Sequence, residues 1–244
     1  MEENQLPVYP EPSRNDAAPA YSVPWKIIDT WIAVGLLVLL NIGLLVFVAL
    51  GQWDGLFESA GIILAEMVYL LPVLLILAWR RVHPKHLGFG RFDAVTMGIG
   101  CSLLIAGYIV IILHNVVLMA LGVDTQGEAI LKIFSELDSP IWFFIVGVVF
   151  APLVEEIFFR GFLFQGFRQR YGWIAAIIIS SSIFAAAHLD PVSFIPTFVL
   201  GAVLAYVYHR SNSVWPGIIL HFLVNAFGLC AAYAATQIPG IIPT

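Results

Sequence analysis

Long apolar stretches separated by short polar segments make up most of the chain. A helix that crosses a membrane needs about 20 consecutive, predominantly apolar residues. Seven stretches have about that length: Trp31–Leu50, Ala60–Trp79, Ala94–Gly122, Ile141–Phe167, Trp173–Leu189, Val192–Tyr208 and Val214–Ala235. The pattern therefore predicts an all-α fold, a polytopic membrane bundle of about seven transmembrane helices.

An eighth segment, Gln126–Leu137, has a different pattern. Its apolar residues recur at helical spacing with charged residues between them, and it is too short to cross a bilayer. Those apolar positions are Ala129, Ile130, Ile133, Phe134 and Leu137. This spacing predicts one amphipathic helix that lies at the membrane interface.

The N-terminal 23 residues are rich in Pro, Glu, Asn and Ala, and we expect them to form a disordered tail. They lack a basic segment joined to a short apolar core, so the pattern does not indicate a cleaved signal peptide. The rest reads as one domain. We expect N-terminal transmembrane helices and a basic cytoplasmic loop over residues 24–93, and a core over residues 94–244.

Composition supports the membrane interpretation. The chain has 244 residues, of which 60% are hydrophobic and only 11% charged, whereas soluble domains carry about 25% charged residues. The basic residues are too few and too dispersed for nucleic-acid binding. Cys101 and Cys230 both fall in apolar segments and predict neither a disulfide nor a CxxC motif. We expect an integral membrane protein in contact with lipid, and the sequence leaves its oligomeric state open.

The distribution of lysine and arginine predicts the orientation. With a cytoplasmic N-terminus, only Lys132 falls in an outside segment, and Arg160 lies within a span. The other nine fall in inside segments: Arg14, Lys26, Arg80, Arg81, Lys85, Arg91, Arg168, Arg170 and Arg210. Because cytoplasmic loops carry an excess of Lys and Arg, we expect this orientation, in the plasma membrane of a bacterium or archaeon.

Three ionisable residues, Glu155, Glu156 and Arg160, fall within six consecutive positions inside the fourth apolar stretch. A charged side chain near the bilayer centre costs roughly 2.5–3.5 kcal/mol on insertion scales, and such residues are usually functional. On a helix Glu156 and Arg160 share a face, while Glu155 points about 100° away. We therefore expect Glu156 and Arg160 to form a structural ion pair and Glu155 to find a partner on another helix.

Polar residues that could meet Glu155 occur in two later stretches. His188 lies near the end of the fifth, and His221 and Asn225 share one face of the seventh at i, i+4 spacing. A carboxylate and a histidine can hold and deprotonate a water, and the remaining donors can receive a developing oxyanion. The alternative is that these side chains only hydrogen-bond helix to helix, each contributing about 0.6 kcal/mol.

These residues form three motifs, EExxxR at 155–160, FxxxH at 184–188 and HxxxN at 221–225. With them the sequence resembles the CPBP (ABI) family of intramembrane proteases, which includes the type II CAAX prenyl endopeptidases. The resemblance covers Gln126 to Asn225, and residues before about Leu87 carry no family signal.

The resemblance implies hydrolysis of a peptide bond within the membrane, with Glu155 and His188 activating water and with His221 and Asn225 on the oxyanion side. The substrate would be a membrane-embedded or lipid-associated peptide or protein, and the sequence leaves open whether it is prenylated. Zinc stays open as a cofactor, and its ligands would be Glu155, His188 and His221. The alternative functions are a non-catalytic membrane scaffold or bacteriocin-immunity-type protein with the same fold, and a transporter with a Glu–His proton relay.

Two further polar residues lie inside predicted spans. Glu66 and His114 have similar depth on antiparallel helices, and we expect them to pair with each other or to face water. Substrate binding is the alternative.

Overall fold

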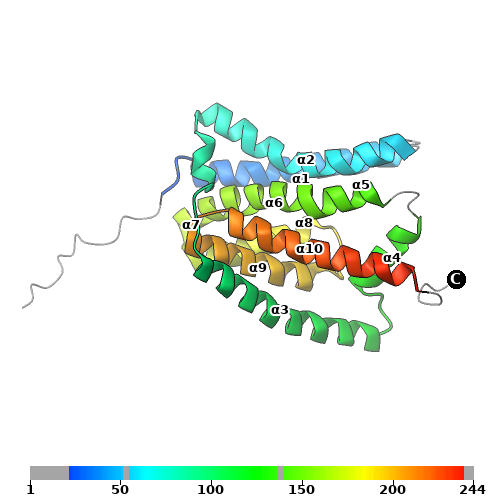
Figure 1. Ribbon diagram of the computed structural model, residues 1–244. Coiled ribbons are helices and arrows are strands. Elements are labelled where there is room, and N and C mark those ends of the chain that lie inside the picture. The colour runs from blue at the N-terminus through cyan, green and yellow to red at the C-terminus, as the bar shows by residue number, and fades with distance from the viewer. Residues whose placement is uncertain (1–21, 52–54, 137–139, 239–244) are drawn as a thin grey trace, which may run out of the picture.

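Apolar segments in lipid must pair their backbone N–H and C=O groups internally, and an α-helix does so within one segment. The computed structural model describes residues 22–51, 55–136 and 140–238, and these residues form a bundle of helices (Figure 1). The described residues contain no β-strand, only an isolated antiparallel bridge between Phe89 and Ser213. The predicted all-α membrane bundle is confirmed.

Each of the seven predicted spans overlaps a helix, and the amphipathic segment is also helical. The helices that stand alone are α1 (Ile27–Leu50), α2 (Gly55–Arg80), α3 (Ala94–Ala120), α4 (Gln126–Glu136), α8 (Trp173–Ala187), α9 (Phe194–Ser211) and α10 (Trp215–Thr236). A short 3₁₀ turn, η1 (Pro84–Leu87), follows α2. The predicted disordered tail falls almost entirely on residues 1–21, outside the described residues.

Length and composition separate these helices into two groups. Within the described residues four helical segments are long and apolar enough to cross a membrane: Ile27–Phe47, Ala94–Ala120, Ile141–Tyr171 and Trp215–Thr236. The apolar helix α8 is shorter. The bundle is therefore that of an integral membrane protein, and a total of seven spans stays a prediction.

The central helix runs unbroken from Ile141 to Tyr171, but its hydrogen-bond pattern changes along its length. Its segments are α5 (Ile141–Phe144), η2 (Ile145–Phe150), α6 (Ala151–Glu156), η3 (Ile157–Phe164) and α7 (Gln165–Tyr171), with η2 and η3 being π-helical. Pro152 lies where η2 gives way to α6, and it has no N–H to donate to the preceding turn. Wider π turns inside a helix often occur at functional sites.

Buried aromatic rings fix the central helix inside the bundle. Five phenylalanines of this helix are fully buried: Phe158, Phe159, Phe162, Phe164 and Phe167. Trp25 stacks on Phe162 with the ring centroids 4.7 Å apart, and Tyr69 of α2 meets Phe158 edge-on at 5.9 Å. Such rings bury large apolar areas and lock each other's orientation. The glutamates of α6 therefore lie on a helix that is held in the centre of the bundle by buried aromatic contacts.

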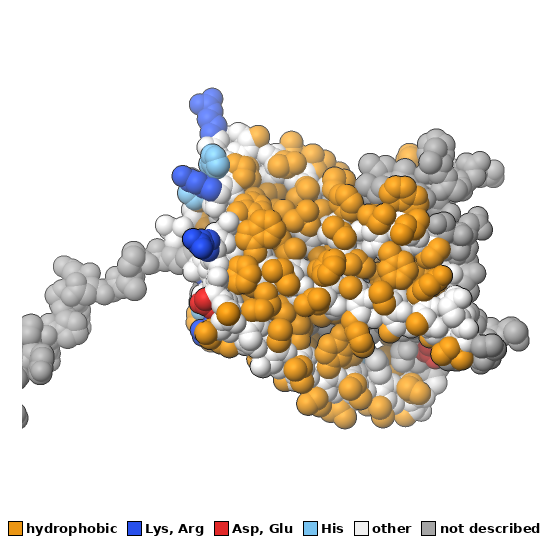
Figure 2. All heavy atoms as spheres, viewed as in Figure 1, with side chains coloured by type: hydrophobic (Ala, Val, Ile, Leu, Met, Phe, Trp, Pro, Cys, Tyr) orange, Lys and Arg blue, Asp and Glu red, His pale blue; other side chains and the backbone are white. Residues whose placement is uncertain are grey.

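The two ends of the bundle differ in charge. Figure 2 shows Lys and Arg side chains gathered at one end, near η1, and apolar side chains covering the face in view beside it. Exposed apolar residues on α1, α3 and α10, such as Leu39, Ile105 and Phe227, suit a surface in contact with lipid. Arg80 at this basic end forms an ion pair with the fully buried Asp29, at 2.7 Å.

The opposite end contains α4 and the C-terminal part of α10 (Figure 1). At about 1.5 Å per residue, α8 and α9 are only roughly 22 and 27 Å long, against roughly 40 Å for α3. Helix α4 packs against α10 at this end, and its Phe134 is buried between Phe143, Phe144 and Tyr233. The amphipathic helix thus covers the end of the bundle that the short helices leave open.

Candidate active site

The two glutamates of α6 point to different surroundings. Glu155 is 5% exposed and lines a cavity, whereas Glu156 is fully buried behind it. Neighbouring residues on a helix point about 100° apart, so two consecutive side chains cannot both face the cavity. The structure therefore gives the two carboxylates separate contacts.

Glu156 and Arg160 lie in contact inside the bundle. Glu156 Oε1 is 2.6 Å from Arg160 Nη1, and both side chains are at most 1% exposed. Arg160 also donates from Nη2 to the Gly201 carbonyl of α9 at 3.1 Å, and its guanidinium lies 4.4 Å from the ring centroid of Phe184. A buried charge of either sign needs such partners. The sequence predicted the contact with Glu156 from the i, i+4 spacing.

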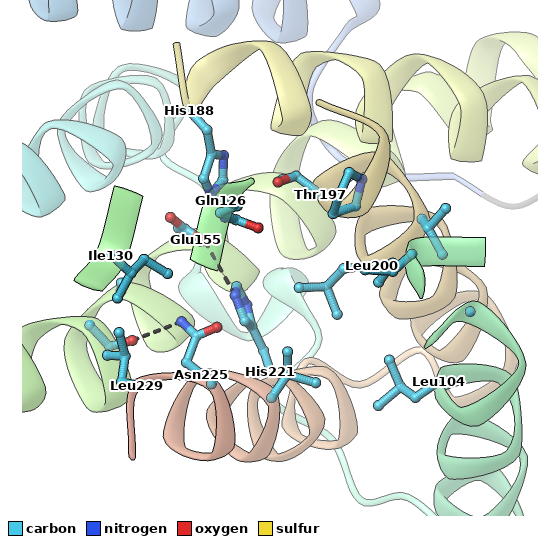
Figure 3. Close-up of a pocket in the computed structure, with 18 of the residues that line it drawn as sticks. Leu104, Gln126, Ile130, Glu155, His188, Thr197, Leu200, His221, Asn225 and Leu229 are labelled. Atoms are coloured by element: carbon cyan, nitrogen blue, oxygen red, sulfur yellow. Dashed lines mark hydrogen bonds and ion pairs between the residues drawn. The ribbon is translucent and has the colours of Figure 1, made fainter. Parts of the chain in front are cut away.

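His188 occupies the C-terminal cap of α8, at the end of the short helix. The next residue, Leu189, has a φ of 54°, and this left-handed turn ends the helix. His188 Nδ1 is 2.8 Å from the Phe184 carbonyl. Because a carbonyl oxygen only accepts hydrogen bonds, Nδ1 carries the hydrogen and Nε2 of the neutral ring is free to accept one. The His188 ring reaches into the cavity near Glu155 (Figure 3).

His221 lies between the two glutamates; it was expected near Glu155, but its contact with Glu156 was not predicted. Its Nδ1 is 3.2 Å from Glu156 Oε1, and its Nε2 is 3.7 Å from Glu155 Oε2. Helix α10 approaches α6 this closely because residue 217, one turn before His221, is glycine. A Cβ at Gly217 would lie 2.6 Å from Glu156 Oε2.

Asn225 lies one turn beyond His221 on the same face of α10 and lines the same cavity. Its Nδ2 donates to the Gly147 carbonyl of η2 at 2.8 Å. A primary amide has two N–H donors. One donor therefore ties α10 to the central helix, and the second is available to another acceptor.

The cavity has a volume of about 490 Å³ and contains Glu155, His188, His221 and Asn225 in its lining (Figure 3). Three of the residues that line the cavity were not predicted as part of the site. Gln126 and Ile130 come from α4, and Thr197 comes from α9 (Figure 3). The sequence predicted that α4 lies at the membrane interface, and it did not indicate that part of this helix would line a cavity.

The prediction that Glu66 pairs with His114 is wrong. Among the described residues, neither Glu66 Oε2 nor His114 Nδ1 has a hydrogen-bond partner, although both atoms are buried. Glu66 lines the cavity from α2, which packs against the central helix, whereas α3 packs against α9 and α10. Similar depth on two helices does not bring side chains together when the helices are not neighbours.

The three residues predicted as zinc ligands do not lie together as a metal site in the described part of the chain. Within the described residues no three His, Cys, Asp or Glu side chains are grouped closely enough to hold a metal ion. Both ring nitrogens of His221 already face a carboxylate, whereas Nε2 of His188 is free, as it is in a metal-binding histidine. As they stand, the three predicted ligands are not gathered into a zinc site.

Comparison with known proteins matches the segment that holds these residues. Residues 137–227 match the family model described as type II CAAX prenyl endopeptidase Rce1-like. The chain is 27% identical over 170 residues to "Putative membrane peptidase YdiL" of Bacillus subtilis, covering 68% of each chain. It is 37% identical over 95 residues to "Membrane-embedded CAAX protease MroQ" of Staphylococcus aureus, covering 36% of this chain and 38% of that protein. No solved structure matches the chain.

Proposed function

We propose that this chain, which is similar to the type II CAAX prenyl endopeptidases and to membrane proteases, hydrolyses a peptide bond with a water activated by Glu155 and His188. One observation carries the proposal. The central helix, α8 and α10 bring Glu155, His188 and His221 into a single cavity within the bundle. A chance set of interhelical contacts would not need to share an accessible space.

Water activation requires a base and a group that orients the water. Glu155 is the base, and its carboxylate faces the cavity. His188 orients the water through Nε2, because its Nδ1 is committed to the Phe184 carbonyl. The water transfers a proton to Glu155 as its oxygen attacks the substrate carbonyl carbon. Glu155 then passes that proton to the leaving amine nitrogen as the C–N bond breaks.

The oxyanion that forms during the attack needs donors that face the same space. His221 and the second amide N–H of Asn225 supply them. A neutral His221 that donates from Nδ1 to Glu156 has a lone pair at Nε2 and cannot stabilise an anion there. A ring that carries hydrogens on both nitrogens can donate to Glu156 from Nδ1 and to the oxyanion from Nε2. Glu156 is thus a positioning residue for His221.

The substrate is a membrane-associated peptide or protein, and we propose that it reaches the cavity from the lipid phase or from the end that α4 covers. The apolar lining of the cavity suits a peptide segment with apolar side chains or an attached lipid. We also propose that the basic end of the bundle faces the cytoplasm, because Lys and Arg gather there.

The test uses the full chain purified in detergent or nanodiscs, with fluorogenic peptide libraries that include prenylated and unmodified members. We expect cleavage by the wild type and loss of cleavage in Glu155→Gln. His188→Ala should lower kcat by roughly 10²–10⁴-fold, the usual contribution of a positioned acid–base group. Glu128→Gln, the same change on the exposed face of α4, is the matched control. Cleavage that persists in Glu155→Gln would refute the mechanism, and no cleavage of any substrate would favour the scaffold alternative.

A further inference from the structure

Glu66 is a cavity carboxylate to which the proposed mechanism assigns no role. It belongs to α2, outside the segment that matches the protease family model. It lines the same cavity as Glu155 and interacts with it electrostatically. Its Oε2 atom is buried and has no hydrogen-bond partner within the described part of the chain. A buried carboxylate oxygen without a partner is costly, so its presence at this cavity requires an explanation.

The charges around the cavity leave Glu66 without a counter-charge. Glu156 is matched by Arg160, and Glu155 faces His221. Among the described residues that line the cavity there is no lysine or arginine. Glu66 therefore has no counter-charge among these residues, so its carboxyl group either carries a proton or pairs with a cation that a ligand supplies.

Nearby aromatic rings suit an organic cation. Tyr69 follows Glu66 by three residues on α2 and shares its face, and Tyr108 of α3 lines the same cavity. The Tyr69 ring is held edge-on against Phe158. A carboxylate beside aromatic rings binds an ammonium or guanidinium group through an ion pair and cation–π contact. A metal ion is a poorer candidate, because no group of three ligands is present in the described residues.

The position of Glu66 along its helix places it beside the reacting centre. Glu66 lies roughly 16 Å from the start of α2, and Glu155 lies roughly 21 Å from the start of α5, at 1.5 Å per residue. Both helices start at the end of the bundle opposite the basic residues (Figure 1). Glu66 and Glu155 line the same cavity from these two helices.

We propose that Glu66 forms a subsite for a lysine or arginine side chain of the peptide substrate, next to the bond that is cleaved. The proposal rests on the proposed protease function, because it assigns a specificity to that cavity. The substrate side chain supplies the counter-charge that the protein lacks, while Glu155 remains free to act on water.

The test is a binding measurement that does not need turnover. The probes are four fluorescent Leu/Ala peptides in which a hydroxyethylene group replaces the scissile bond. Each carries either a lysine or an uncharged norleucine, placed on one side of that group or the other. Affinities are measured by fluorescence polarisation with the full chain in nanodiscs. We expect the lysine probe to bind about 10- to 100-fold more tightly, the usual gain of a charge-assisted hydrogen bond.

Variants assign that preference to Glu66. Glu66→Gln keeps the size of the side chain and should remove the preference for lysine without weakening the norleucine probe. Glu66→Asp keeps the charge and should retain part of the preference, and Glu128→Gln, outside the cavity, should keep all of it. Equal affinities in the wild type would overturn the proposal. A preference for lysine that survives in Glu66→Gln would also overturn it. An equal loss of affinity for the lysine and norleucine probes in folded Glu66→Gln and Glu66→Asp would do the same.

The same proteins tested with cleavable versions of the peptides separate the two proposals. A lysine preference in binding without any cleavage would support the subsite and refute the protease mechanism. Cleavage that is equally fast with lysine and norleucine, together with equal binding, would support the protease and overturn the subsite.

Discussion

Replacing Glu156 by glutamine tests the buried ion pair on which the site is built. The two side chains are at most 1% exposed, and the shortest N–O distance is 2.6 Å. Glutamine keeps the shape and one acceptor oxygen but removes the charge. Arg160 then keeps its bond to the Gly201 carbonyl and its contact with Phe184, but it has lost the anion that offset its burial.

The size of the effect follows from these distances. At 2.6 Å and an effective dielectric constant of about 20, the attraction between unit charges is about 6 kcal/mol. Desolvation of both groups cancels part of it, and removal of one partner of a buried pair usually costs about 3–5 kcal/mol. The hydrogen bond that glutamine retains puts the expected loss near the lower end, about 3 kcal/mol. For a chain of this length that corresponds to a fall in Tm of roughly 6–12 °C.

The assay is thermal unfolding in detergent, followed by the fluorescence of the seven tryptophans, with Glu128→Gln as the control for loss of a carboxylate. The double variant Glu156→Gln/Arg160→Met removes both charges and should lose less stability than the sum of the single variants. A Tm of Glu156→Gln equal to that of the wild type would refute the pairing argument.

Three further predictions address chemistry and orientation. Glu155→Gln should abolish turnover but leave the Tm within about 2 °C of the wild type, because it removes a base at the cavity wall and keeps its shape. Exhaustive chelation of metals should leave activity intact. His221→Ala should lower kcat by roughly 10²–10³-fold, as expected for loss of an oxyanion donor. Zinc that co-purifies with the wild type and is lost in His221→Ala would contradict this metal-free mechanism. After replacement of the two exposed free cysteines, Cys101 and Cys230, a single cysteine at Lys85 should react with impermeant maleimide only in opened cells, and labelling of intact cells would reverse the orientation.

The fold was predictable because the bilayer imposes a strong and simple rule. The lengths of the apolar stretches and the positions of the polar segments between them located all the long helices. The π-helical segments of the central helix did not affect this prediction, because they do not interrupt the helix. The sequence located the two short stretches that form α8 and α9, but it did not predict that α4 would cover the end of the bundle beside them. That outcome depends on contacts such as Phe134 with Tyr233, between residues far apart in sequence.

The site was predictable as a set of residues but not as a set of contacts. Spacing within one helix predicted that Glu156 would meet Arg160. The partners of Glu66 and His221 depended on which helices are neighbours, and periodicity carries no such information. The expected Glu66–His114 pair failed for that reason, and the contact between His221 and Glu156 was missed for the same reason.

The contact between His221 and Glu156 gives Arg160 of the EExxxR motif an indirect connection to the imidazole of His221. Glu156 Oε1 lies 2.6 Å from Arg160 and 3.2 Å from His221 Nδ1, so one carboxylate oxygen receives both donors. Arg160, anchored to α9 through the Gly201 carbonyl, thereby fixes the oxygen that orients the imidazole on α10. Nε2 of the same ring then faces Glu155 at 3.7 Å. The series Arg160, Glu156, His221 and Glu155 links a structural ion pair directly to the proposed base. A residue that never touches the substrate can therefore control the chemistry, because it sets which ring nitrogen faces the cavity.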